Sequence, residues 1–457
     1  MRFIARYAKD NINEFEIITV FDSRVESISV NKSTPKVKSL FYEYPASSWF
    51  ERKIHDDFGI EFEESYDQRP LVWHERFPAN CYPLQKSFTK KEIAFSDYKP
   101  YPYEVVEGDG VFQVSVGPIH AGIIESGHFH FSQSGERMLH QEIRHFYKNR
   151  GIEKMLEGKS LEEAKPIVAR ISGNESIAYQ LCLNDILFQS SHKPIPLELQ
   201  KYHALLLELE RVVHHLTDLG FIPNDTGFAS ALAYCSKLSE DTRRWLKRLT
   251  GHRFGFGAIT TIKPSIDIKA FKSWLEEMKK AIKFFESWIL EIPSLLDRLE
   301  GTGILSKEEA LTHSAVGIIA RASGVAVDRR EESAFYQEHG FTMTLKEKGD
   351  VYARFTLRID EVKNSILLIE NLLEEGAFEA DDLGILEDGT YRSFCESSIG
   401  ELFMSIEIQS GVIERFYVRD PSFVNWQLMH LMMRSDIIAD FPLINKSCDL
   451  SYAGSDL

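Results

Sequence analysis

Thiolate chemistry is the first possibility to test in this sequence, because cysteine sulfur is the usual ligand of soft metals and the source of disulfides. Its five cysteines are odd in number, far apart and never arranged as Cys-x-x-Cys: Cys81, Cys182, Cys235, Cys395 and Cys448. This spacing favours neither a disulfide framework nor a zinc ribbon, and it provides no iron-sulfur motif. A Gly-x-Gly-x-x-Gly nucleotide loop is also absent. We expect a reducing compartment, with any electrons arriving through a partner.

Composition excludes several classes of protein. The 457 residues are 43% hydrophobic and 27% charged, which is typical of a soluble globular protein of about three domains' length. A formal charge of -16 argues against nucleic acid as a partner, since phosphate binding needs a basic face. The N-terminus lacks the apolar core of a signal peptide, and no run approaches the roughly 18 apolar residues of a membrane span. Any membrane association is therefore expected to be peripheral.

The elements that must position chemical groups begin with a predicted small α+β domain over residues 1–95. Strand-like runs at 15–21 and 25–30 precede an amphipathic helix at 46–58, which Gly59 ends. A Pro- and Tyr-rich stretch at 98–103 predicts an extended linker over residues 96–110. Alternating residues 111–116 then predict a strand that ends at a turn, and functional residues often lie just past such a turn.

Residues 111–457 are predicted to form a second domain, a mainly helical bundle flanked by short β-segments. Helical periodicity covers 196–219 before Gly220, then 268–292, a segment from Ser306 with a Ser-x-x-Glu cap, and 349–375. Strand-like alternation returns at 402–408 and 412–418, followed by a helix over 421–438. We expect an α+β fold overall, with residues 111–131 near 402–418.

Short motifs carry a resemblance to two families. Trp49-Phe50-Glu51-Arg52 and Asp57-Phe58-Gly59-Ile60 resemble the end of the C-type subunit of complex I (NADH-quinone oxidoreductase). Later motifs resemble its D-type subunit and the large subunit of membrane-bound nickel-iron hydrogenases: Gly117-Pro118-Ile119-His120, Arg150-Gly151-Ile152-Glu153-Lys154, Asn174-Glu175, Ala178-Tyr179, Asp225-x-Gly227, Arg321-Ala322-Ser323-Gly324 with Asp328, Gly349 to Arg354, and Gly400-Glu401. Many short motifs in sequence order are far more specific than any one of them. Their fusion further resembles the large subunit of formate hydrogenlyase-type complexes.

The resemblance also shows what is missing. Such hydrogenases hold nickel through two Cys-x-x-Cys pairs, and here Asp420-Pro421-Ser422-Phe423-Val424-Asn425 stands at the later pair. The place of the earlier pair, residues 169–176, has no cysteine. Serine and asparagine do not replace thiolates at nickel. We therefore expect this chain to bind no metal and no cofactor of its own apart from a quinone, and to receive electrons from iron-sulfur clusters in a partner subunit.

Residue roles follow from the same resemblance. His120, Tyr179 and Asp225 match the residues that line the quinone head-group cavity of complex I, and such a trio suits protonation of a reduced quinone. In the related hydrogenases similar residues belong to a structural shell, which is the alternative. Glu153 matches the proton-relay glutamate of hydrogenases, and its alternative is a capping or ion-paired glutamate. We take Glu153, His120 and Asp225 as candidate catalytic residues.

Arg321, Asp328 and Arg354 match positions near the cluster-bearing partner, where the resemblance implies an interface ion-pair network. It implies an NADH dehydrogenase-like or hydrogenase-like oxidoreductase, with functions in quinone and NAD binding, and partners that are an iron-sulfur small subunit and antiporter-like membrane subunits. The expected location is the cytoplasmic side of the inner membrane. A non-redox structural subunit is the alternative, and a working nickel-iron hydrogenase is disfavoured by the missing thiolates.

Overall fold

The computed structural model describes residues 1–89, 93–121, 124–434 and 436–457. Its N-terminal part is an antiparallel sheet of β1 (Phe3–Asp10), β2 (Glu14–Phe21) and β3 (Val25–Asn31), with α1 (Ser47–Phe58) packed on β1. A small parallel pair joins β4 (Lys36–Lys38) to β5 (Glu61–Glu63). The predicted helix and its stop are confirmed, since Gly59 has φ 76° and its amide donates to the His55 carbonyl.

The rest of the chain is mainly helical, with small sheets, so the predicted α+β fold class is confirmed. Its helices before the C-terminal region are α2 (Ile152–Leu156), α3 (Leu161–Val168), α4 (Ser176–Ser190), α5 (Leu197–Asn224), α6 (Ala229–Thr250), α7 (Ile268–Ile289), α8 (Pro293–Leu299), α9 (Lys307–Thr312), α10 (Gly317–Ala322), α11 (Ala334–Glu338) and α12 (Val351–Leu372). Its sheets are β6 (Val111–Val116), β7 (His128–Ser134) and β8 (Arg137–Arg144); β9 (Ile262–Lys263) and β10 (Phe378–Glu379); and β11 (Gly389–Glu396), β12 (Glu401–Gln409) and β13 (Val412–Arg419).

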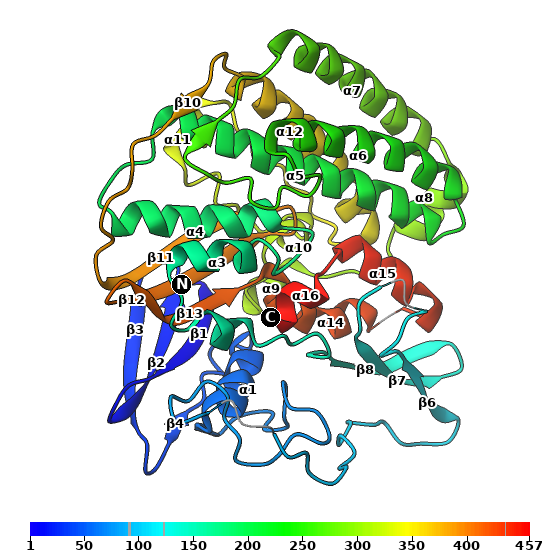
Figure 1. Ribbon diagram of the computed structural model, residues 1–457. Coiled ribbons are helices and arrows are strands. Elements are labelled where there is room, and N and C mark those ends of the chain that lie inside the picture. Colours follow the sequence, from blue (N-terminus) through cyan, green and yellow to red (C-terminus); the bar gives the residue numbers. More distant parts are fainter. Residues whose placement is uncertain (90–92, 122–123, 435) are drawn as a thin grey trace.

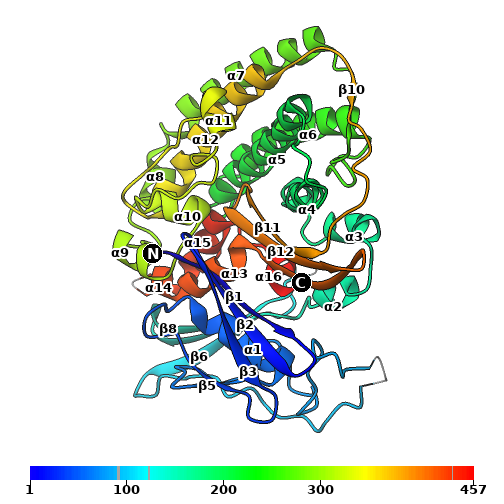
Figure 2. The same ribbon diagram turned by 90° about the vertical axis from the view of Figure 1, so that its left-hand side faces the viewer.

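These elements form layers (Figure 1). Helices α5, α6, α7 and α12 stack at one end, the N-terminal sheet lies at the other, and the β11–β13 sheet lies between them, which the turned view also shows (Figure 2). Helix α4 packs on β11, and β1 packs on β13. The central sheet therefore connects the N-terminal part to the helices. None of the helices in the described ranges is both long and apolar enough to cross a membrane.

The prediction that Gly220 ends a helix is wrong, because α5 continues to Asn224. Gly220 lies instead where α5 crosses α6. A Cβ added there would meet the Leu232 Cα and the Cys235 Cβ, both at 3.1 Å. The glycine allows two backbones to approach, so its role is tertiary packing and not helix termination.

The segment predicted as one helix over 421–438 is broken into short pieces. Helix α13 (Pro421–Asn425) is followed by a 3-10 turn at Trp426–Leu428, α14 (Met429–Met433), a second 3-10 turn at Ile438–Asp440, α15 (Phe441–Cys448) and α16 (Tyr452–Asp456). The expected proximity of 111–131 to 402–418 is also not what the described contacts show. Phe129 packs on Trp426 and on Phe441, and α14 packs on β8, so the β6–β8 sheet lies against these C-terminal helices.

The two predicted domains share one hydrophobic core. Tyr7 of β1 stacks on Tyr417 of β13 with ring centroids 4.2 Å apart, and Phe50 of α1 meets Phe423 of α13 at 4.7 Å. A second, smaller core that includes Phe15, Ile54 and Phe58 belongs to the N-terminal part. The boundary at residue 95 therefore divides the chain by motif resemblance, but the two sides pack together in one core.

We expect Gly220→Val to lower the free energy of unfolding by about 1–3 kcal/mol, because the added side chain has no room between α5 and α6. Ser236→Val is the matched control: it places the same side chain at an exposed position of α6, where changes usually stay within about 0.5 kcal/mol. Urea unfolding of both variants measures the difference. Equal effects would contradict the close approach.

Candidate functional site

The later cysteine positions of the hydrogenase pattern hold side chains that are fully used in internal hydrogen bonds. Ser422 and Asn425 lie in α13 and are 0% exposed. The Ser422 hydroxyl accepts from the Ser451 amide at 2.8 Å. The Asn425 side chain donates to the Val316 carbonyl at 3.1 Å and accepts from the Val316 amide at 3.2 Å. These groups fix backbone segments to one another.

Residues 169–176, the place of the earlier cysteine pair, lie beside the same C-terminal segment that Ser422 contacts. The Ser172 and Ser451 hydroxyls lie 3.1 Å apart, and the Ser176 hydroxyl donates to the Ala169 carbonyl at 2.8 Å. Hydroxyl and amide groups are not the soft ligands that nickel requires in this family. In the described ranges, no group of three or more His, Cys, Asp or Glu side chains is placed to hold a metal ion.

Tyr179 points into this polar cluster. It is 0% exposed on α4, and its hydroxyl donates to Asp420 Oδ2 at 2.5 Å. Burial, together with the nearby Asp420 and Glu175 carboxyls, raises the pKa of Tyr179 well above its ordinary value. The Tyr179 hydroxyl is therefore enclosed in this structure, and its predicted place in a quinone cavity stays a prediction.

Helix α16 closes the cluster. A Cβ added to Gly454 would lie 2.0 Å from Asp420 Oδ2, so only glycine lets this helix approach the carboxyl. On the other side of α16, the Tyr452 ring lies against Gly127, where an added Cβ would be 2.5 Å from the ring. The 451–457 segment therefore fills space beside the two serine-lined positions.

His120 lies in the loop after β6, where its Nε2 donates to the Gly127 carbonyl at 2.7 Å. Gly127 in turn packs on Tyr452 of α16, whereas Asp420 meets the same helix at Gly454. Asp225 follows the last residue of α5 and is exposed. Within the described residues, no hydrogen bond joins His120, Tyr179 and Asp225. Their role in a quinone cavity stays a prediction.

Glu153 is buried in α2 at the seam between the two sequence families. Its Oε1 lies 2.8 Å from Lys53 Nζ of α1, and its Oε2 lies 2.6 Å from an Arg415 guanidinium nitrogen of β13. Burial alone would raise the pKa of Glu153, but Lys53 and Arg415 bring it below its ordinary value. This geometry matches the ion-paired alternative, whereas a relay acid needs a raised pKa.

A cleft of about 330 Å³ lies beside Glu153, between the N-terminal part and the segment that leads into α2. Asp57 and Asp456 also line it. Burial raises the pKa of Asp57 to about 6 against the opposing effect of Lys53, and burial raises the pKa of Asp456 to about 7. The carboxyls with raised pKa values in this cleft are thus Asp57 and Asp456; Asp57 opens one of the quoted motifs, but neither residue was predicted as a site residue.

The three predicted interface residues are internal. Arg321 is 0% exposed and lies 3.2 Å from Asp328 and 2.8 Å from both Glu361 and Glu396. Arg354 is also 0% exposed, and it donates to the carbonyls of Gly349 and Gly303 and to the Ser447 hydroxyl. These side chains hold their own chain together, so they would affect a partner only indirectly, and the interface assignment stays a prediction.

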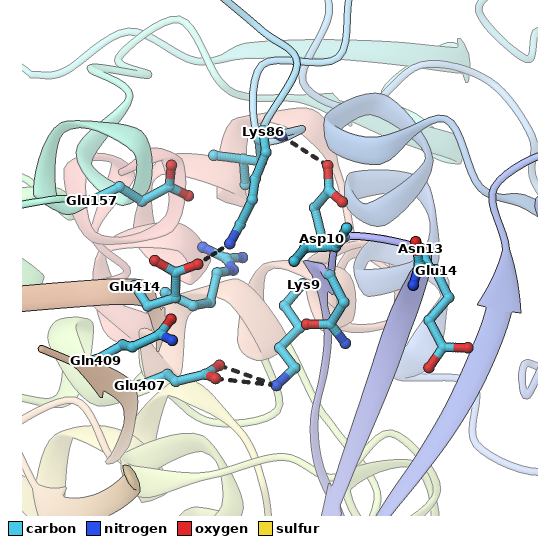
Figure 3. A pocket seen from close by; sticks show the side chains of 13 residues that line it. Lys9, Asp10, Asn13, Glu14, Lys86, Glu157, Glu407, Gln409 and Glu414 are labelled. Carbon is cyan, nitrogen blue, oxygen red and sulfur yellow. Dashed lines mark hydrogen bonds and ion pairs between the residues drawn. The ribbon is translucent and has the colours of Figure 1, made fainter. Parts of the chain in front are cut away.

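A larger groove of about 540 Å³ lies on the surface between the β1–β2 turn and the β12–β13 hairpin (Figure 3). Its lining is polar, and many of its side chains are already paired, with Lys9 bound to Glu407 and Lys86 to Glu414. Arg415, the partner of Glu153, also lines it. None of the predicted site residues does, and the groove has no feature that selects a ligand.

Comparisons with known proteins find relatives for both parts of the chain. Residues 3–93 match the family described as respiratory-chain NADH dehydrogenase, 30 Kd subunit, and residues 225–383 match the 49 Kd subunit family. One polypeptide therefore carries matches to both of these family models.

Among individual relatives, formate hydrogenlyase subunit 5 of Escherichia coli is 27% identical over 94% of this chain and 78% of its own length. The C/D 1 subunit of NADH-quinone oxidoreductase from Aquifex aeolicus is 24% identical over 98% of this chain and 84% of its own length. A protein in the structure of the membrane-bound sulfane sulfur reductase, an archaeal respiratory membrane complex, superimposes with a TM-score of 0.70 at 22% identity. That likeness covers 76% of this chain and 99% of the other, and it shows the fold. The chain is thus related to fused C/D subunits and to formate hydrogenlyase subunits, as its motifs predict.

We expect Glu153→Gln to lower the free energy of unfolding by about 3–5 kcal/mol at pH 7, because Arg415 stays buried without its counter-charge and Lys53 keeps only its pair with Asp57. The folded pKa of Glu153 is lowered, so this contribution is present above about pH 4.3 and is lost as the pH falls through the folded pKa. Glu157→Gln is the control, since Glu157 is 20% exposed and pairs with Lys154 at 2.8 Å, a pair worth about 0–1 kcal/mol. Similar losses in both variants at pH 7 would argue against a buried ion pair.

Purified protein is expected to contain no stoichiometric nickel, because neither serine-lined position offers a thiolate. The double variant Ser422→Cys with Asn425→Cys should not bind nickel either. It supplies only two thiolates, whereas the hydrogenase pattern uses four. Elemental analysis of both proteins after growth with added nickel is the measurement. About one nickel per wild-type chain would refute the expectation.

Proposed function

We propose that this chain is the large peripheral subunit of a membrane-associated, complex I-like or hydrogenase-like oxidoreductase, and that it contributes no nickel chemistry. The observation that carries the proposal is the fusion of the 30 kDa-type and 49 kDa-type parts around one core, with the cysteine positions filled by packed serine and asparagine. Such a protein would form the walls of a binding site, and electrons would reach that site from a partner subunit.

The proposed partners are an iron-sulfur small subunit and antiporter-like membrane subunits, with the complex on the cytoplasmic side of the inner membrane. The lack of any Cys-x-x-Cys in the sequence supports an external cluster. A quinone is the proposed acceptor, with His120, Tyr179 and Asp225 as its candidate contacts. Because the Tyr179 hydroxyl is enclosed in the isolated chain, this proposal requires that assembly with a partner exposes it. NAD enters this proposal only through such a complex.

A non-redox structural subunit is the second candidate. The enclosed Tyr179 hydroxyl and the ion-paired Glu153 favour it, because both groups already have internal partners. In that case the chain would couple a membrane module to another soluble protein through shape alone.

Affinity capture of the full chain from detergent-solubilised native membranes tests the first proposal. Co-purification of a cluster-bearing protein with integral membrane subunits, with reducible iron-sulfur signals in electron paramagnetic resonance, is the expected result. Capture of membrane subunits without any redox centre would favour the structural role, and recovery of the chain alone from both membrane and soluble fractions would refute both.

Turnover of the captured complex separates the two roles further. Under the redox proposal, Asp225→Asn should reduce quinone-dependent turnover at least about tenfold with assembly intact, which corresponds to about 1.4 kcal/mol in the barrier. Asp267→Asn is a control on the exposed surface, at the cap of α7. Normal turnover in Asp225→Asn would show that Asp225 has no role in the reaction.

A further inference from the structure

Two buried carboxyls face each other beside the serine-lined positions. Glu175 precedes α4, Asp420 precedes α13, and their side chains are 0% and 1% exposed. Tyr179 connects the two residues, since its hydroxyl donates to Asp420 Oδ2 at 2.5 Å and its amide donates to the Glu175 carbonyl at 3.0 Å, and the two carboxyls are close enough for Asp420 to raise the pKa of Glu175. Among the ion pairs of the described chain, neither carboxyl has a cationic partner. Two unpaired like charges cannot both remain ionised in such an interior.

The hydrogen bonds assign different states to the two groups. Asp420 has the environment of a carboxylate, since its Oδ2 accepts from the Tyr179 hydroxyl at 2.5 Å and its Oδ1 accepts from the Ser422 amide at 2.7 Å. Glu175 has the environment of a neutral acid. Its Oε1 accepts from the Ser397 hydroxyl, whereas its buried Oε2 has no donor among the described residues. An oxygen without a donor that lies beside a carboxylate is suited to carry the proton itself.

We propose that Glu175 and Asp420 form a proton-binding site that holds one proton on Glu175 Oε2, donated to Asp420, with Tyr179 and Ser397 holding the pair in place. The site stands beside the positions at which the hydrogenase pattern has metal-binding cysteines, and its ligand is a proton. Losing this proton to a base would leave two adjacent carboxylates, which Tyr179 and the Ser422 amide must then stabilise. The inference deepens the proposed redox function by adding a proton-binding site, and it rests on that function for its role in a complex.

Neighbouring charged groups are consistent with the assignment. Glu210 of α5 accepts from the Ile177 and Ala178 amides at 2.7 and 3.2 Å, so it binds the N-terminus of α4 and supplies no cation to the pair. Arg150 is a cation near Tyr179, but its guanidinium donates to the carbonyls of Arg170, Ile171 and Ala453. Arg211 faces Glu210. Within the described ranges, no cation is left to neutralise the pair.

The titration behaviour points in the same direction. Burial raises the pKa of Glu175 well above its ordinary value, and Asp420 raises it further. A carboxyl whose folded pKa is raised stabilises the folded state most below the unfolded pKa, about 4.3, and this contribution is lost as the pH rises through the folded pKa. Wild-type stability should therefore fall more steeply with rising pH than the stability of Glu175→Gln, in which an amide donates to Asp420 at every pH.

Infrared difference spectroscopy of the full chain tests the proposal. Several buried carboxyls contribute protonated carbonyl bands at neutral pH, and one component of that absorption should be present in wild type, lost in Glu175→Gln and shifted in deuterium oxide. Glu210→Gln is the matched control, because burial raises the pKa of Glu210 to about 8 and its own band can be subtracted. A wild-type spectrum that Glu175→Gln does not change overturns the proposal.

Tyr179→Phe keeps the test decisive if Glu175→Gln does not fold, since it leaves both carboxyls in place. Removing the hydroxyl donor destabilises the doubly ionised pair most, so the carbonyl band should persist to higher pH than in wild type. An unchanged or lowered titration midpoint overturns the proposal. Either failure concerns the pair alone, and the capture experiment on membranes still decides the subunit assignment independently.

Discussion

Glu401 is the charge on which the arrangement of the chain depends. This carboxylate, at the start of β12, is 0% exposed and pairs with Arg2 at 2.6 Å, with Arg329 at 2.5 Å and with Arg419. Burial would raise the pKa of Glu401, but the three guanidinium groups hold it well below its usual range. Removing it would leave Arg2 and Arg419 without an ion-pair partner and Arg329 with Glu332 alone, a strongly destabilising loss for largely buried cations.

The three arginines explain why this one residue matters for the pocket. Arg2 leads into β1, Arg329 follows α10, and Arg419 ends β13. The residue after Arg419 is Asp420. The ion pairs of Glu401 therefore fix where, and in which direction, the chain enters the serine-lined cluster. Seating of the N-terminal sheet and placement of the Asp420 carboxyl are thus two results of one ion-pair system.

Serine and asparagine at the cysteine positions change the chemistry of the pocket while the surrounding fold is kept. Serine hydroxyls and an asparagine amide tie α13 to Val316 and to residue 451, and α16 packs over them on a glycine. A polar cluster of this kind is stable only when almost every group has a partner. The few oxygens that lack a donor, such as Glu175 Oε2, therefore stand out against a well-satisfied background.

Local patterns predicted much of the fold but little of the site geometry. The strands at 111–116 and 412–418 and the capped helix after Ser306 follow from alternation and from a capping box, which are encoded within a few residues. Strand β1 was missed because its side chains are buried on both faces, which removes the alternation. Gly220 was misread because glycine is favoured in two situations that look alike in sequence. A helix end favours it because it adopts positive φ, and a close helix crossing favours it because it has no Cβ.

The sequence motifs predicted which residues lie at the site but not which residues they contact. Motifs located Glu153, Tyr179 and Arg321, yet their partners Lys53, Asp420 and Glu361 lie about 40 to 240 positions away in sequence. Such pairings are set by tertiary packing, which no local period records. The Asn174-Glu175 motif was noted, and only the position of Asp420 shows what Glu175 faces.

The seam between the N-terminal part and the rest of the chain has a further consequence. Tyr7 on Tyr417, Phe50 on Phe423 and Lys53 on Glu153 are contacts that two separate polypeptides would have to form by association, with a loss of translational and rotational freedom. Residues 96–110 connect the two sides, so they meet at an effective concentration set by a short tether, on the order of millimolar. Docking at this seam is therefore insensitive to protein concentration, and the contacts there can evolve toward weaker affinity without the two halves coming apart.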